Sequence, residues 1–212
     1  MSPSLEQATG WWISYLDLAP KFFRRFDMWS LAKHIIAWSD ASGEGRWLCA
    51  MIRMSDGRYM WTRTRVGDDL YNQFLFRRDN QIQAQELLST ILIFMTFQKE
   101  LKGNFVSCFT DNNSVLHGLT KGRASSHSPD INTLVGRTWL HLAKEHIAIH
   151  FYRVESKANP TDGPTRNTCE LQDKIGAQFV APVLPCWALN VWLPLRPNSD
   201  DLAFCDPYPS SV

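Results

Sequence analysis

The sequence predicts an α/β domain in which helices flank a mixed five-stranded sheet, in the chain order βββ-α-β-α-α-β-α. Two observations predict this class. The dipeptide Asp56-Gly57 separates two strand-like runs, which indicates a β-hairpin between antiparallel strands. After residue 80, helix-length segments alternate with short apolar runs, which is typical of parallel strands joined by right-handed crossovers.

The elements follow in order along the chain. Strands are expected at 34–38, 45–54 and 58–65. Residues 68–80 are expected to form a loop, and a helix at about 81–101 ends before Gly103, which suits a helix stop. The remaining elements are a strand at 104–109, a helix at 112–119, a basic loop at 121–126, a helix at 129–145, a strand at 148–154 and a last helix near 170–175.

Composition limits the class of protein and its partners. A chain of 212 residues can bury a sufficient core without disulfides, and its net charge of +1 excludes a strongly basic nucleic-acid coat. Five scattered cysteines without a C-x-x-C spacing favour reduced thiols and an intracellular protein, cytoplasmic or nuclear. The longest apolar run, 87–97, is too short to span a bilayer, so we expect no membrane partner.

Three regions are expected along the chain. Residues 1–33 would form a helical connecting segment, because the stretch from Trp11 to Phe26 is aromatic-rich and suits an amphipathic helix. Residues 34–178 would form the α/β domain. Residues 179–212 would form a tail outside it, because the chain from Pro182 onward has six prolines, two tryptophans and little periodicity.

Two carboxylates are expected at the ends of neighbouring strands. Asp40 follows the first strand, and Asp111 follows the fourth strand where a helix begins. In open α/β sheets, ligands bind beyond the carboxyl ends of the strands, so both acids would face one crevice. Two close carboxylates repel each other unless positive charge lies between them, and a divalent cation is the simplest such charge.

Two further acids can reach the same point. Glu86 lies in an apolar helix that must pack on the sheet, where an unpaired polar group costs at least ~1 to 3 kcal/mol. Asp162 opens the last helical region. Ligands that offer only oxygen favour two Mg²⁺ ions, or Mn²⁺ in their place, and two such ions roughly 4 Å apart support phosphodiester hydrolysis.

Four motifs occur in this order: SDAS at 39–42, QAQELL at 83–88, FTDNNSVLHGL at 109–119 and ESKANPTDGPTR at 155–166. Together they resemble the ribonuclease H domain attached to reverse transcriptases, most closely that of DIRS-like, tyrosine-recombinase retrotransposons, over about residues 35–175. The resemblance implies a ribonuclease H-like fold and an endonuclease that hydrolyses the RNA strand of RNA/DNA hybrids. It implies Asp40, Glu86, Asp111 and Asp162 as metal ligands, and a reverse transcriptase domain on a longer polyprotein as a partner.

Candidate contacts with nucleic acid surround these acids. Backbone groups near Ser42 and Gly43 would suit ribose 2′-hydroxyls, and cations in the basic loop would suit phosphates. Lys157 stands where related enzymes keep a mobile histidine, but its ammonium group cannot shuttle a proton near pH 7. The candidates are Ser42, Gly43, Asn112, Asn113, Lys121, Arg123 and Lys157.

Two other functions stay open from the sequence alone. A catalytically inactive domain of the same fold would serve as a scaffold or a nucleic-acid-binding module, and an integrase-like enzyme of the wider fold would cut DNA strands. Acids at all four positions favour an enzyme over a scaffold. The hairpin, the long helix and the final motif favour hybrid cleavage over DNA cleavage.

Overall fold

The computed structural model describes residues 3–22, 33–76, 78, 81–125 and 127–190. The strands are β1 (His34–Ser42), β2 (Trp47–Arg53), β3 (Tyr59–Arg65), β4 (Phe105–Thr110), β5 (Ala148–Arg153) and β6 (Gln178–Phe179). The helices are α1 (Pro3–Phe22), α2 (Asp68–Tyr71), α3 (Ile82–Thr96), α4 (Gln98–Leu101), α5 (Asn113–Lys121), α6 (Pro129–Lys144), the 3₁₀ helix η2 (Ser156–Ala158), α7 (Asp162–Thr165), α8 (Glu170–Lys174) and α9 (Cys186–Leu189).

The strands form one mixed sheet in the order β5-β4-β1-β2-β3-β6. β1, β2 and β3 pair antiparallel, whereas β4 pairs parallel to β1, β5 parallel to β4, and β6 parallel to β3. The predicted α/β class, with a mixed sheet and flanking helices, is confirmed. The predicted count of five strands is wrong, because β6 adds a sixth.

The sixth strand depends on a chain reversal after α8. Gly176 has a φ of 63°, in the left-handed region that glycine adopts without strain. The chain then runs beside β3, where the Val180 N–H donates to the Trp61 carbonyl at 2.9 Å and the Phe179 ring meets Trp61 edge-on at 5.1 Å between centroids. A strand of two residues carries no periodic signal, so it could not be predicted from the pattern.

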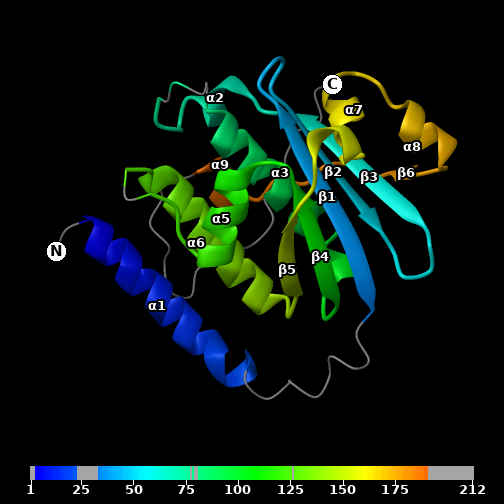
Figure 1. The fold of residues 1–212 in the computed structure, drawn as a ribbon. Helices are drawn as coiled ribbons and strands as arrows, with labels where there is room; N and C mark the ends of the chain where they lie inside the picture. The colour runs from blue at the N-terminus through cyan, green and yellow to red at the C-terminus, as the bar shows by residue number, and fades with distance from the viewer. Residues whose placement is uncertain (1–2, 23–32, 77, 79–80, 126, 191–212) are drawn as a thin grey trace, which may run out of the picture.

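Helices lie on both sides of the sheet (Figure 1). α3, α5 and α6 cover one face, and α1 lies outside α6, where the Trp11 indole N–H donates to the Gly136 carbonyl at 2.9 Å. α7 packs on the other side against β1 and β2. This placement brings the segment after β5 to the end of β1. Among the described residues, no helix has the length and apolar character needed to cross a bilayer.

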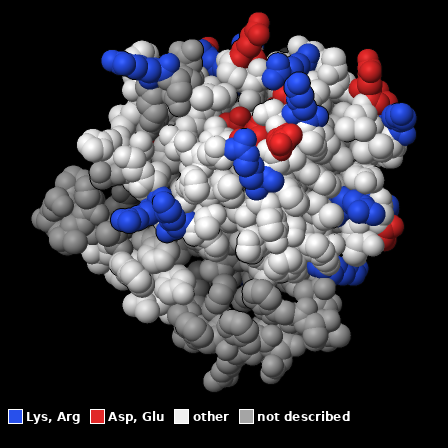
Figure 2. Space-filling view, viewed as in Figure 1, with Lys and Arg blue, Asp and Glu red and all other residues white. Residues whose placement is uncertain are grey.

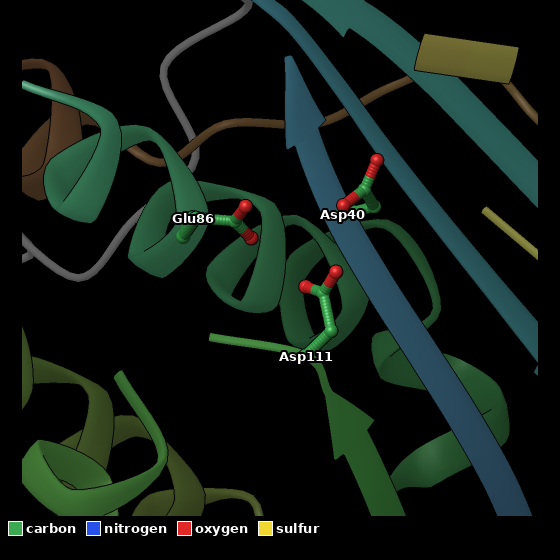
Figure 3. A group of neighbouring side chains, drawn as sticks. All are labelled: Asp40, Glu86 and Asp111. Carbon is green, nitrogen blue, oxygen red and sulfur yellow. The ribbon is translucent and has the colours of Figure 1, made fainter. Parts of the chain in front are cut away.

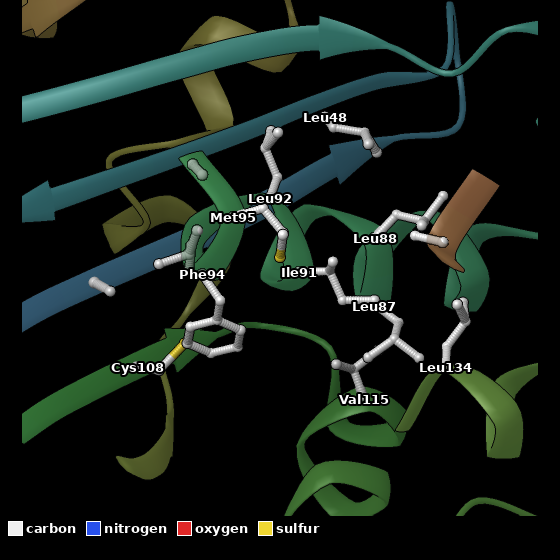
Figure 4. Packing of buried hydrophobic residues seen from close by; sticks show 14 of the residues in the cluster. Leu48, Leu87, Leu88, Ile91, Leu92, Phe94, Met95, Cys108, Val115 and Leu134 are labelled. Atoms are coloured by element: carbon white, nitrogen blue, oxygen red, sulfur yellow. The ribbon is translucent and has the colours of Figure 1, made fainter. Parts of the chain in front are cut away.

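The core is centred on α3, in which every residue from Ala84 to Met95 is buried (Figure 4). Leu88, Leu92 and Phe94 are among the fully buried side chains that fill the space between this helix, the sheet and α6. The buried hydroxyls of Ser39 and Thr90 bond to each other at 3.0 Å and join β1 to α3. This hydrogen bond satisfies the buried hydroxyl group of Thr90 inside the core.

Two predicted boundaries around α3 need correction. The single helix predicted at 81–101 is two helices, because the backbone at Phe97 leaves helical geometry (φ −105°, ψ 25°). The break allows Phe97 and Leu101 both to be fully buried. The predicted loop at 68–80 contains α2, whose first turn holds Asp68 and Asp69, where acids are favoured by the helix dipole.

The segment that follows β6 packs on the domain as far as residue 190. Leu184 and Ala188 belong to the core cluster. Gln73 donates to the Leu189 carbonyl at 2.7 Å, and Arg137 donates to the Asn190 carbonyl at 3.0 Å. The boundary predicted at residue 178 therefore lies too early, because apolar residues scattered between prolines complete the core. Residues 191–212 of the predicted tail lie outside the described residues.

Candidate metal centre

Three acidic side chains from separate elements converge at one end of the sheet. Asp40, Glu86 and Asp111 each offer a carboxylate oxygen, and these oxygens lie within 4.8 Å of one another. Figure 3 shows the three side chains directed toward a common point between β1, α3 and the end of β4. A divalent cation bound by oxygen ligands requires this kind of convergence.

Local structure explains why the three acids meet. Asp40 lies near the carboxyl end of β1, and Asp111 directly follows β4, which pairs parallel to β1. Parallel neighbours end at the same edge of a sheet, so the two acids lie side by side. Glu86 is in the second turn of α3, and its carboxylate accepts a hydrogen bond from the Ala41 backbone.

Burial and like charge both oppose ionisation at this cluster. Desolvation is the main reason that the pKa of Asp40 rises from 3.8 to about 6, and the charges of Asp111 and Asp162 add to the rise. The pKa of Glu86 is also raised well above its usual value, first by desolvation and then by the charges of Asp40 and Asp111. A bound cation would offset both effects and favour the ionised carboxylates.

A buried oxygen without a partner supports a metal at this site. Among the described residues, Oε2 of Glu86 is a buried carboxylate oxygen with no hydrogen-bond partner. Such an atom costs free energy unless something binds it. The three acids offer oxygen ligands alone, and oxygen ligands suit Mg²⁺ or Mn²⁺. The residues present therefore fit a divalent cation.

Asp162 is not a member of this group. Its Oδ1 accepts a hydrogen bond from Arg166 Nε at 3.0 Å and forms an ion pair with another guanidinium nitrogen of Arg166 at 2.9 Å, one helical turn later. Asp162 is nevertheless close enough for its charge to raise the pKa of Asp40. The structure therefore brings together three of the four predicted ligands, with the fourth beside them in an ion pair.

Two hydroxyl groups that contact the acids were missed by the sequence reasoning. Thr165 donates to Asp40 Oδ2 at 2.6 Å, and Ser156 donates to Asp111 Oδ2. Both lie in the segment that carries Asp162, and each is far from its acid in the chain. The sequence indicated these two residues only through their place inside the motif at 155–166. No sequence pattern marks a serine or threonine as a hydrogen-bond donor to an acid far away in the chain.

The predicted nucleic-acid contacts differ in exposure and in their protein partners. Lys121, Arg123 and Lys157 are exposed, as is Gly43. Asn112 instead has a structural role, because its side-chain oxygen caps α5 by accepting from the backbone N–H groups of the second and third helical residues.

The other two candidates also contact protein groups. The Ser42 hydroxyl donates to the Glu44 carbonyl at 2.9 Å. The Asn113 side chain accepts a hydrogen bond from Arg153, an exposed cation at the end of β5 that the sequence reasoning did not single out.

An open cleft of about 330 Å³ lies between the β1–β2 turn and α7, and one of its lining residues, Thr165, bonds Asp40. Figure 2 shows acidic side chains gathered on this face between α5 and α7, with Lys and Arg side chains around them. Such an arrangement gives an electrostatic potential that is negative at the centre and more positive at the edge. The cleft is lined by Ser42, Glu44, Gly45, Trp47, Thr165, Arg166 and Asn167.

Comparison with known proteins does not assign a family. A scan against protein-family models gave no match, and a search of curated proteins gave no relative.

The raised pKa of Asp40 predicts how pH changes stability without metal. Below its unfolded pKa of 3.8, Asp40 is protonated in both the folded and the unfolded state. Between 3.8 and about 6, the folded state binds more protons than the unfolded state, so the free energy of unfolding falls as pH rises. With EDTA present, we expect Asp40→Asn to be more stable than the native chain by about 3 kcal/mol at about pH 7 and no more stable near pH 4. Urea unfolding at both values measures this difference, and an equal gain at both would contradict it.

Proposed function

We propose that this chain is a metal-dependent endonuclease of the ribonuclease H type, which hydrolyses the RNA strand of RNA/DNA hybrids. One observation carries the proposal: carboxylate oxygens from β1, α3 and the end of β4 lie within 4.8 Å of one another, and Glu86 contributes a buried oxygen that lacks a partner. The sheet order and the four motifs support the same family. The resemblance also makes a reverse transcriptase domain the proposed neighbour on a longer polyprotein.

The proposed roles follow from position. Asp40, Glu86 and Asp111 would hold the cation, and Asp162 would join them when a second ion competes with Arg166 for its carboxylate. Two Mg²⁺ ions, or Mn²⁺ in their place, would supply an activated water and stabilise the leaving oxygen of the phosphodiester when bound. The partly buried Ser42 lines the cleft and the exposed Gly43 follows it in the chain, and backbone groups here would contact ribose groups.

The test is a comparison of substrates under one condition. The chain is incubated with Mg²⁺ and a short labelled RNA/DNA hybrid, double-stranded RNA, double-stranded DNA or either single strand. We expect cleavage of the RNA in the hybrid alone, with 3′-hydroxyl and 5′-phosphate ends, and none in EDTA. Cleavage of double-stranded DNA would favour an integrase-like nuclease, and no cleavage with bound metal would favour an inactive scaffold.

Two exposed basic residues, Lys121 at the end of α5 and Arg123 in the loop after it, are expected to contribute to binding through phosphate. Replacing both Lys121 and Arg123 by Ala should weaken hybrid binding and reduce the slope of log K against log salt by about 1 to 2, because each phosphate contact releases about one counterion. Lys99→Ala, which removes a basic side chain of α4, is the matched control. Fluorescence anisotropy with an inactive variant measures both slopes, and an unchanged slope would assign this loop to the solvated surface.

A further inference from the structure

The segment between β5 and α8 contacts the acids at two separate places. Thr165 donates to Asp40 Oδ2 at 2.6 Å from the end of α7, and Ser156 donates to Asp111 Oδ2 from the start of η2. The acids belong to β1 and the end of β4, so one segment holds two different parts of the cluster. We call the hydroxyls of Thr165 and Ser156 the hydroxyl clamp.

The segment itself is anchored to β1 between these contacts. The buried Asn159 side chain donates to the Ser39 carbonyl at 2.9 Å, immediately before Asp40. Its oxygen in turn accepts from the Thr161 hydroxyl at 2.6 Å, which fixes the orientation of the Asn159 amide. The backbone that carries the two clamp hydroxyls is therefore fixed to β1 through Asn159.

Thr165 is placed to control the orientation of Asp40. Its side chain is 2% exposed, so water cannot readily replace the hydroxyl. The same hydroxyl lies 2.8 Å from the Asp162 carbonyl, but a bond to a carboxylate is the stronger one because its acceptor is charged. Figure 3 shows one oxygen of Asp40 directed toward Glu86 and Asp111 and the other directed away.

We propose that Thr165 and Ser156 are positioning residues of the metal centre. Each hydroxyl bonds one oxygen of its acid and thereby fixes the side-chain orientation that turns the other oxygen toward the shared cation. The inference rests on the metal centre of the proposed function. It concerns metal affinity, however, and does not depend on which substrate is cut. Thr165, which is buried, carries the larger effect, and Ser156, which is exposed, the smaller one.

The test measures Mn²⁺ affinity of the full chain by electron paramagnetic resonance of the free ion. Thr165→Val keeps the shape of the side chain and removes the hydroxyl, and we expect it to weaken Mn²⁺ binding by about 10- to 100-fold, the usual effect of losing a partner of a metal ligand. Thr165→Ser keeps the hydroxyl and should bind within about threefold of the native chain. The Mn²⁺ affinity of Ser156→Ala should lie between those of Thr165→Val and Thr165→Ser.

A matched control comes from the same segment. Thr168 is exposed and its hydroxyl bonds the Gly163 carbonyl at 3.0 Å without touching an acid, so Thr168→Val should leave Mn²⁺ affinity unchanged. Native-like affinity in Thr165→Val would overturn the proposal, and so would a loss in Thr165→Ser equal to that in Thr165→Val. If Thr165→Val does not fold in EDTA, the exposed Ser156→Ala decides, and unchanged affinity there would overturn the clamp.

The two proposals fail in different ways. A native chain that binds Mn²⁺ but does not cut the hybrid overturns the nuclease assignment, while the affinities of the variants still decide the clamp. A native chain that binds no Mn²⁺ overturns both, because the clamp then has no metal to serve.

Discussion

Asp111→Asn is expected to reduce cleavage of the RNA/DNA hybrid by about three orders of magnitude. Asp111 is one of the three acids whose oxygens converge, and the amide that replaces it is a weaker ligand for a divalent cation. Metal ions contribute several kcal/mol to phosphodiester hydrolysis, and each 1.36 kcal/mol corresponds to a factor of ten in rate. Single-turnover cleavage at saturating Mg²⁺ measures the loss.

The structure supplies controls that separate catalysis from folding. Without metal, Asp111→Asn should be at least as stable as the native chain, because it removes a charge that opposes ionisation of Asp40 and Glu86. Asp173→Asn removes an exposed acid on α8 and should leave cleavage unchanged. Full activity in Asp111→Asn would exclude this acid from the reaction.

Leu92→Ala is expected to lower the free energy of unfolding by about 3 kcal/mol. Leu92 is fully buried in α3, where it packs between the helix and the sheet (Figure 4). Replacing a buried leucine by alanine costs about 2 to 5 kcal/mol, through lost transfer free energy and the cavity that remains. Urea unfolding in EDTA, with an unchanged m-value, measures the loss of stability.

An exposed leucine provides the comparison. Leu171 on α8 is 43% exposed, so Leu171→Ala should change stability by less than about 0.5 kcal/mol. A loss below about 1 kcal/mol in Leu92→Ala would show that this face of α3 is not tightly packed in solution. The position of Glu86, six residues earlier on the same helix, depends on that packing.

Local patterns predicted the parts of the fold that set the site. The Asp56-Gly57 turn forms the expected hairpin, and Gly57 has a φ of 90°. Gly103 ends the α3–α4 region with a φ of 71°, as its lack of a side chain permits. Asp40 and Asp111 meet because their two apolar strands pair in parallel. That pairing could be predicted, since a helix connects the two strands.

Long-range contacts were beyond the reach of the sequence pattern. The pairing of β6 with β3 and the burial of Leu184 in the core depend on where the chain returns in space. Likewise, Asp162 was expected among the ligands, but Arg166 one turn later provides a closer partner. The contact between Thr165 and Asp40 joins residues 125 positions apart, and no local periodicity reports such a pair.

An anomalous difference map from crystals soaked in Mn²⁺ would show whether Asp40, Glu86 and Asp111 bind a divalent cation. We expect a manganese peak bounded by oxygens of all three acids, at about 2.0 to 2.3 Å from each. The peak should disappear in crystals of Asp40→Asn. Crystals of the native chain with no manganese at this cluster, at concentrations that fill exposed acidic sites, would contradict the account.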